Sequence, residues 1–129
     1  MSIEVVKQVY EAFDQGDMDR VLSLMSEDVQ WDHRGPPPTP INHLYTGKDG
    51  VAEFFELFYA TQEILDFQVH EFFESGNKVV TLGFYSFRIK ETGKTWESEY
   101  AATWTVEDGL VTRWRPIQDM TAEAEAYRP

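Results

Sequence analysis

Residues 78–119 read KVVTLGFYSFRIKETGKTWESEYAATWTVEDGLVTRWRPIQD and contain the pattern that decides the fold. Apolar and polar residues alternate through three runs, residues 78–90, 95–107 and 110–119, which is the period of a half-buried β-strand. The connections ETGK and EDG place Gly where a tight turn requires a positive φ. We therefore predict antiparallel strands, and a similar run at 67–74 followed by SGN adds one strand ahead of them.

The chain before these strands shows helical spacing instead. Apolar side chains recur at intervals of three and four from Ser2 to about Gln15 and again from about Lys48, as on one buried helix face. Between them, Gly16 ends the first helix and Asp17 is a suitable N-cap for a short second helix. We also predict a brief strand at 29–33, an irregular proline-rich segment at 35–40 and a last helical turn at 121–129 that frays.

This order of elements predicts an α+β fold in which a long curved antiparallel sheet wraps over N-terminal helices. A strongly bent sheet that helices close at one end leaves a cone-shaped interior, and the inward side chains of that cone form a natural ligand pocket. The sequence contains no internal repeat or linker, so we expect residues 1–129 to form a single domain.

The composition narrows the classes of function. Among 129 residues, 11 Lys plus Arg face 23 Asp plus Glu, and the net charge of −12 repels phosphate backbones and anionic lipid. We therefore expect no nucleic acid and no membrane partner. There is no Cys, the His spacing is irregular and no Gly-rich phosphate loop occurs, so we expect no metal and no other cofactor. The amphipathic N-terminus differs from a signal peptide, which favours a cytoplasmic location.

Several stretches together carry a family resemblance. YEAFDQGDMDRVLSLMSEDVQW, then LYTGKDGVAEFFELF, and finally EDGLVTRWRPIQD follow one another in an order similar to the ketosteroid-isomerase-related, SnoaL-like branch of the nuclear transport factor 2-like superfamily. The resemblance covers nearly the whole chain and implies a cone-shaped α+β roll, commonly a homodimer, with a pocket between sheet and helices. The functions that it implies range from isomerisation and polyketide cyclisation to plain ligand binding, so it indicates the fold more narrowly than the reaction.

The resemblance also suggests candidate catalytic residues. Ketosteroid isomerase uses an Asp general base together with a Tyr and a protonated Asp that stabilise the enolate oxygen. Aligned through GDMD, the position of that base falls on His33, which can accept a proton at neutral pH. The two oxyanion donors align with Val9 and Ala102, so neither is retained, and a literal ketosteroid isomerase is not expected.

Other hydroxyl groups could replace those donors. Tyr85 and Tyr100 are the best candidates to donate to a carbonyl oxygen on the inner face of the sheet. The three positions that activate water in related epoxide hydrolases fall on Gly83, Tyr85 and Pro116, which sets that reaction aside. At the end of the last predicted strand, Asp119 precedes a helix-like run, and we favour an N-cap role for it.

Alternation along the strands predicts the rest of the pocket. The expected substrate-binding residues are Trp31, His43, Tyr45, Trp96, Trp104, Trp114 and Gln118. Such an aromatic lining suits a flat, mostly apolar ligand with a carbonyl group, handled by isomerase- or cyclase-like acid–base chemistry. The alternative is a non-catalytic ligand-binding or dimerisation module, because large aromatics at alternating positions also simply fill a core. The outer face carries Val80, Leu82 and Phe84, which favours a homodimer through that face.

Overall fold

The computed structural model describes residues 2–129, so the first residue of the expected 1–129 domain lies outside the description. Two short helices open the chain, α1 (Ser2–Asp14) and α2 (Met18–Ser23), and strand β1 (Met25–Asp32) follows them. Strand β2 (Leu44–Thr46) leads directly into α3 (Gly47–Thr61), which is followed by β3 (Gln62–Ser75), β4 (Lys78–Ile89), β5 (Thr95–Glu107), β6 (Leu110–Ile117) and α4 (Met120–Tyr127). The predicted α+β class is confirmed.

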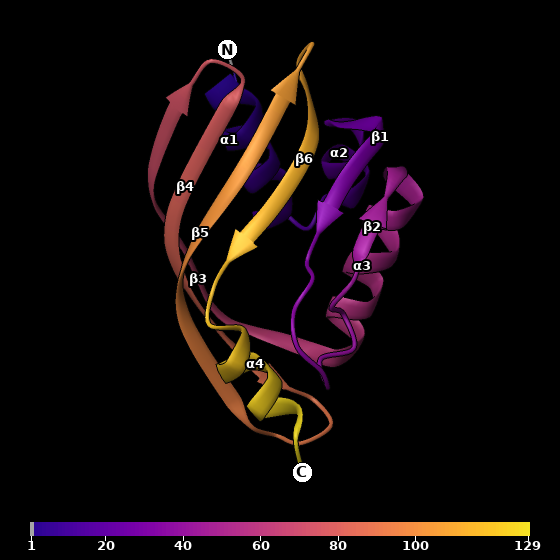
Figure 1. The fold of residues 1–129 in the computed structure, drawn as a ribbon, viewed down its shortest axis with the longest axis vertical. Helices are drawn as coiled ribbons and strands as arrows, with labels where there is room; N and C mark the ends of the chain where they lie inside the picture. Colours follow the sequence, from indigo (N-terminus) through magenta and orange to yellow (C-terminus); the bar gives the residue numbers. More distant parts are fainter. Residues whose placement is uncertain (1) are drawn as a thin grey trace.

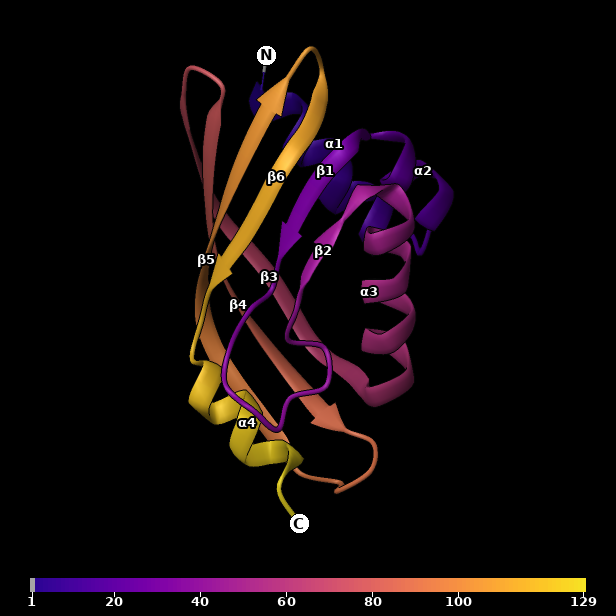
Figure 2. The same cartoon turned by 45° about the vertical axis from the view of Figure 1, so that its right-hand side comes forward.

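The strands form one curved sheet in the order β2-β1-β6-β5-β4-β3. The four long strands β3 to β6 are an antiparallel meander, as the alternation predicts, whereas β1 pairs in parallel with β6 and antiparallel with β2. Helices α1, α2 and α3 lie against the concave side of this sheet, and α4 covers one end (Figures 1 and 2). The space between sheet and helices is the interior of the cone.

The helices form where the apolar spacing indicates. The buried face of α1 includes Val6 and Val9, and that of α3 includes Val51, Phe54 and Phe58. These side chains pack against the inward residues of the sheet and form one continuous core. Burying such a branched or aromatic side chain contributes roughly 1.5–3 kcal/mol, so this packing holds the sheet and the helices together.

The alternation in the long strands is confirmed as well. In β4 the side chains of Thr81, Tyr85 and Phe87 are buried, while their neighbours in the strand are more exposed. The close approach of three strands depends on Gly83, which lies opposite Tyr100 in the register. A Cβ at this position would lie 2.0 Å from the backbone oxygen of Gln68 and 2.7 Å from the Tyr100 ring. Only glycine therefore allows the Tyr100 ring to pack over β4 at this point.

Four predictions from the sequence need correction. Strand β1 begins at Met25, not at residue 29, and β3 begins at Gln62, not at residue 67, because neighbouring strands supply hydrogen-bond partners that the local pattern cannot show. Strand β2 is absent from the prediction since its three residues are ordered by pairing with β1. The C-terminal segment is not a fraying turn: α4 is a helix of eight residues that buries Glu123, Ala124 and Ala126.

None of the helices in residues 2–129 combines the length and the apolar character needed to cross a membrane.

Candidate functional site

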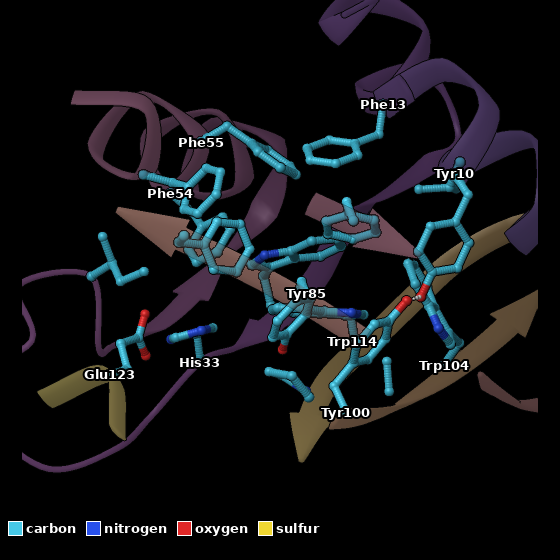
Figure 3. Close-up of a pocket in the computed structure, with 18 of the residues that line it drawn as sticks. Tyr10, Phe13, His33, Phe54, Phe55, Tyr85, Tyr100, Trp104, Trp114 and Glu123 are labelled. Carbon is cyan, nitrogen blue, oxygen red and sulfur yellow. Dashed lines mark hydrogen bonds between the residues drawn. The ribbon is translucent and has the colours of Figure 1, made fainter. Parts of the chain in front are cut away.

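The site is a cavity in the interior of the cone, lined by residues of α1, β1, α3, all four long strands and α4 (Figure 3). Most of its lining side chains are Phe, Tyr or Trp, and no Lys or Arg takes part. The cavity measures about 90 Å³. An engineered apolar cavity that binds one benzene ring measures about 150 Å³, so even a ligand with a single ring requires some of the lining aromatic side chains to move.

Stacked rings dominate the walls of the cavity. The rings of Trp31 and Trp114 stack at a centroid distance of 4.1 Å, and those of Tyr85 and Tyr100 stack at 4.4 Å. The first pair joins neighbouring positions of β1 and β6, and the second joins β4 to β5. Flat surfaces of this kind favour a flat partner, because offset stacking adds about 0.5–1.5 kcal/mol per ring pair to the burial of area.

A first cluster of hydrogen-bonded polar side chains lies at one end of the cavity. The Tyr10 hydroxyl lies 2.7 Å from Thr81 Oγ1, and Tyr100 donates its hydroxyl proton to the Tyr10 oxygen at 3.3 Å. The Trp104 indole N–H donates to Thr81 Oγ1 at 3.1 Å. Burial raises the pKa of Tyr10 and Tyr100 above the ordinary value for tyrosine, so both hydroxyls stay protonated at neutral pH.

A second cluster of polar side chains surrounds the buried carboxyl group of Glu123. Glu123, in α4, is 1% exposed. Gln62 Nε2 donates to Glu123 Oε2 at 2.8 Å, and Gln118 Nε2 donates to Glu123 Oε1 at 3.0 Å. The two amide oxygens accept hydrogen bonds in turn. Trp96 donates its indole N–H to Gln62 Oε1 at 3.0 Å, and the Tyr85 hydroxyl donates to Gln118 Oε1. The carboxyl group is thus held between two amides and lines the cavity.

Burial places the titration of Glu123 near neutrality. Desolvation raises the pKa of Glu123 to about 7, and the hydrogen bonds from Gln62 and Gln118 offset only part of this effect. A general acid or base works best when its pKa lies close to the pH at which it acts. Glu123 is therefore the group in this cavity whose ionisation is best matched to proton transfer at neutral pH.

His33 follows β1 and is the second buried titratable group in the cavity. Asn42 Nδ2 donates to the Pro36 carbonyl oxygen at 2.9 Å, so Asn42 Oδ1 is left to accept from His33 Nδ1 at 3.0 Å. This arrangement places the proton of the neutral ring on Nδ1 and the free lone pair on Nε2. Burial lowers the pKa of His33 to about 4, so the imidazole is neutral and able to accept a hydrogen bond at neutral pH.

The cavity brings together seven of the ten residues predicted for the site. They are Trp31, His33, Tyr85, Trp96, Tyr100, Trp104 and Trp114. The remaining three do not line it. Gln118 accepts a hydrogen bond from the Tyr85 hydroxyl. Tyr45 donates its hydroxyl proton to the Ile41 carbonyl oxygen, and the His43 ring packs edge-on against the Tyr45 ring.

Two polar residues of the cavity are absent from the predicted set, namely Tyr10 and Glu123. Tyr10 carries a weak signal, because it lies on the apolar face of α1 and its hydroxyl must find a partner when buried. Glu123 lies in a short Ala-rich helix without a marked apolar stripe, so nothing in the sequence separates it from the exposed Glu125 two residues later.

Two acidic residues close to the site have structural roles. Asp119 Oδ1 accepts a hydrogen bond from the Ala122 backbone N–H at 2.9 Å, which confirms the predicted N-cap of α4. Asp32 is 3% exposed and forms a two-pronged ion pair with Arg34, at 2.8 Å for each contact, and a longer one with Arg113 at 3.4 Å. The hydrogen bond from Arg34 lowers the pKa of Asp32, which therefore remains ionised.

A cone-shaped α+β roll with a cavity between sheet and helices defines the nuclear transport factor 2-like class of proteins. The SnoaL-like domain model matches residues 6–114. The chain therefore belongs to the SnoaL-like domain family.

Solved structures agree with this assignment over nearly the whole chain. A nuclear transport factor 2-like protein of Burkholderia xenovorans LB400 superposes with a TM-score of 0.89 at 27% identity, over 98% of this chain and 95% of that one. TerC, co-crystallised with polyporic acid, gives 0.82 at 28% identity, over 97% and 96% of the two chains. A candidate polyketide cyclase of Pseudomonas putida KT2440 gives 0.75 at 21% identity, over 98% and 97%, which shows a shared fold alone. The search of curated protein sequences finds no match.

Proposed function

We propose that the cavity binds a planar, mostly apolar compound with a carbonyl group and catalyses proton transfer at a carbon next to that group, as an isomerase or cyclase does. The observation that carries this proposal is the combination of an aromatic cavity with two buried titratable groups, His33 and Glu123, within its lining. A buried ionisable side chain is costly to the fold, so two of them in the lining of one aromatic cavity mark it as a candidate functional site.

The ligand class follows from the walls. Stacked indole and phenol rings offer flat apolar surfaces, and the polar groups that line them are few. The acidic surface of the chain, with a net charge of −12, and the carboxyl of Glu123 both disfavour a strongly anionic ligand at alkaline pH. The similarity to TerC, which was co-crystallised with polyporic acid, adds that compound to the ligands worth testing.

The proposed chemistry is a proton transfer in two steps. A base in the cavity takes a proton from the carbon next to the carbonyl, and the C–H electron pair moves into a C=C bond while the carbonyl π pair moves onto oxygen. In an isomerisation the enolate is conjugated with a C=C bond, and the base returns the proton to another carbon of that system. In a cyclisation the enolate carbon attacks a second carbonyl carbon, the π pair of that carbonyl moves onto its oxygen, and the base returns the proton to the alkoxide. No metal and no other cofactor takes part in either outcome.

Two bases can serve this step. His33, the base that the family alignment suggests, presents a neutral imidazole with a free lone pair on Nε2. With a pKa of about 4 it is a weak base, whereas Glu123 titrates at about 7. In the proposed site His33 therefore accepts the proton only if the ligand itself is acidic, and Glu123 serves the less acidic ligands. Tyr85 and Tyr100, the expected donors to the developing oxyanion, can serve it only by giving up their hydrogen bonds to Gln118 and Tyr10.

The alternative is a binding module that uses the same cavity without chemistry. A thermal-shift screen against aromatic ketones, steroids and polyporic acid tests both, since a ligand that binds only the folded state raises the melting temperature. Each stabilising compound is then incubated with the wild type, His33→Ala and Glu123→Gln and followed by NMR. Conversion by the wild type that either substitution abolishes supports the enzyme. Stabilisation without conversion supports the binding module, and no stabilisation contradicts both.

We also propose that the chain forms a homodimer through the outer face of the sheet. Phe73 on β3 and Ile117 on β6 are 53% and 57% exposed, and Val80, Leu82 and Phe84 on β4 lie between them, only half-buried. A contiguous apolar patch across a sheet is typical of an interface between protein chains. A two-fold axis through this face would cover the patch on both copies.

A further inference from the structure

The indole N–H of Trp31 differs from the other buried polar groups of the cavity. Trp31 lies in β1, which pairs with β2 on one side and with β6 on the other. Its side chain is 2% exposed and lines the cavity. Within residues 2–129, its Nε1 has no hydrogen-bond partner.

This lack of a partner is unusual for the site. The indoles of Trp96 and Trp104, also buried in the cavity wall, donate to Gln62 at 3.0 Å and to Thr81 at 3.1 Å. Leaving a buried donor without an acceptor destabilises the folded state, so buried donors in native proteins are nearly always satisfied. A donor left over on a side chain that lines a cavity is available to an acceptor that arrives with a ligand.

The surroundings of the Trp31 ring leave the cavity as the route for that acceptor. Trp114 covers one face of the indole at 4.1 Å, and Phe54, Phe55 and Trp104 lie at 5.8–6.0 Å. None of these side chains carries an acceptor atom. The hydroxyl protons of two lining tyrosines are already engaged, because Tyr85 donates to Gln118 and Tyr100 donates to Tyr10.

We propose that the Trp31 indole N–H binds the carbonyl oxygen of a planar aromatic ketone or quinone and so selects carbonyl compounds over hydrocarbons of the same shape. This inference rests on the proposed function, since it requires a flat ligand in the cavity, and it assigns the oxygen of that ligand to one atom. Trp31 is then the specificity-determining residue of the site. A neutral hydrogen bond of this kind contributes about three- to tenfold in affinity.

The test uses two probes that differ mainly in the carbonyl group, 1-indanone and indane. The chain contains four Trp, so a ¹H–¹⁵N spectrum contains four indole signals, and the signal lost in Trp31→Phe identifies the one of interest. We expect 1-indanone to move this signal downfield, as a new hydrogen bond does, and indane to leave its proton shift nearly unchanged. Trp31→Phe should weaken 1-indanone three- to tenfold and indane less than twofold.

Trp104→Phe is the matched control, because it also removes an indole N–H from the cavity wall, but one that Thr81 already accepts. It should change the affinities of both probes by the same factor. If both probes bind and Trp31→Phe also weakens both equally, the assignment to Trp31 is overturned while the aromatic cavity stands. If the wild type binds neither probe, the proposed function fails and the inference fails with it. Should Trp31→Phe not fold, the wild-type indole shift alone decides, since an unmoved signal with bound 1-indanone overturns the assignment.

Discussion

Replacing Glu123 by Gln should raise the stability of the protein at alkaline pH relative to its stability at acid pH. Burial raises the pKa of Glu123 from 4.5 to about 7 in the folded state. Between these values the folded state holds a proton that the unfolded state has released, so the stabilisation is fully present below pH 4.5 and is lost as pH rises through 7. The interval of about 2.5 in pKa corresponds to roughly 3 kcal/mol.

The effect of Glu123→Gln follows from this sign. A Gln side chain cannot ionise. Its amide NH₂ group would lie where a Glu123 oxygen now accepts from Gln62 or Gln118, and this lowers the stability of the folded state by an amount that does not depend on pH. Relative to the wild type, the variant should therefore gain about 3 kcal/mol between pH 5 and pH 8, on top of a constant offset.

His33 contributes with the opposite sign. Its pKa falls from 6.5 to about 4 on folding, so the unfolded state binds the extra proton and stability rises with pH across this range. In the wild type the opposite effects of His33 and Glu123 on the free energy of unfolding nearly cancel between pH 4.5 and 6.5. Glu123→Gln should remove that cancellation and uncover a rise of roughly 3 kcal/mol between pH 4 and 6.5, which belongs to His33.

Urea unfolding followed by circular dichroism at pH 4.5, 6 and 8 measures these differences. Glu125→Gln is the control, since Glu125 lies on the same helix but is exposed, and its pH profile should match that of the wild type. A difference between Glu123→Gln and the wild type that stays constant from pH 5 to pH 8 would refute the buried, neutral carboxyl and with it the proposed role of Glu123 in proton transfer.

Three further predictions concern the frame of the site. Gly83→Ala should lower the free energy of unfolding by about 1–3 kcal/mol in urea titrations, because its Cβ would overlap the Gln68 backbone oxygen; an unchanged midpoint would contradict the close approach of the strands. Asp119→Ala should cost about 1 kcal/mol by the same assay through loss of the hydrogen bond to Ala122 N–H, and Asp119→Asn should recover most of it. Phe84→Glu should convert the proposed dimer into monomers in analytical ultracentrifugation without a change in cavity ligands; a variant that remains dimeric would exclude this face as the interface.

Much of the fold could be predicted because its long strands carry their own signal. In β4 and β5 a buried residue follows at every second position, and the large aromatic residues among them mark the inward face in the sequence. The same alternation placed Tyr85, Tyr100 and Trp104 on one inner face, where they line the cavity. The short strand β2 and the parallel pairing of β1 with β6 could not be predicted, because both depend on distant partners.

The chemistry of the site depends on packing more than on pattern. That His33 is neutral follows from its burial and from the orientation of Asn42, and neither can be deduced from WDHRG. Glu123 acquires its raised pKa only when α4 closes one end of the cone and brings Gln62 and Gln118 onto its carboxyl group. Likewise, the Trp31 N–H has no hydrogen-bond partner among the described residues, and this depends on how the surrounding side chains pack in the folded protein.

If a base in the cavity takes a proton from a carbon next to a carbonyl group, that proton exchanges with solvent, and the rate of this exchange measures the proposed step directly. 1-Indanone is incubated with the protein in D₂O at neutral pH, and the loss of its signal from the protons next to the carbonyl is followed by ¹H NMR. We expect exchange faster than in buffer, and slower exchange with Glu123→Gln than with the wild type, because 1-indanone is a weakly acidic ketone and Glu123 is the stronger base. Bound 1-indanone that exchanges no faster than in buffer would contradict proton transfer and leave a binding module.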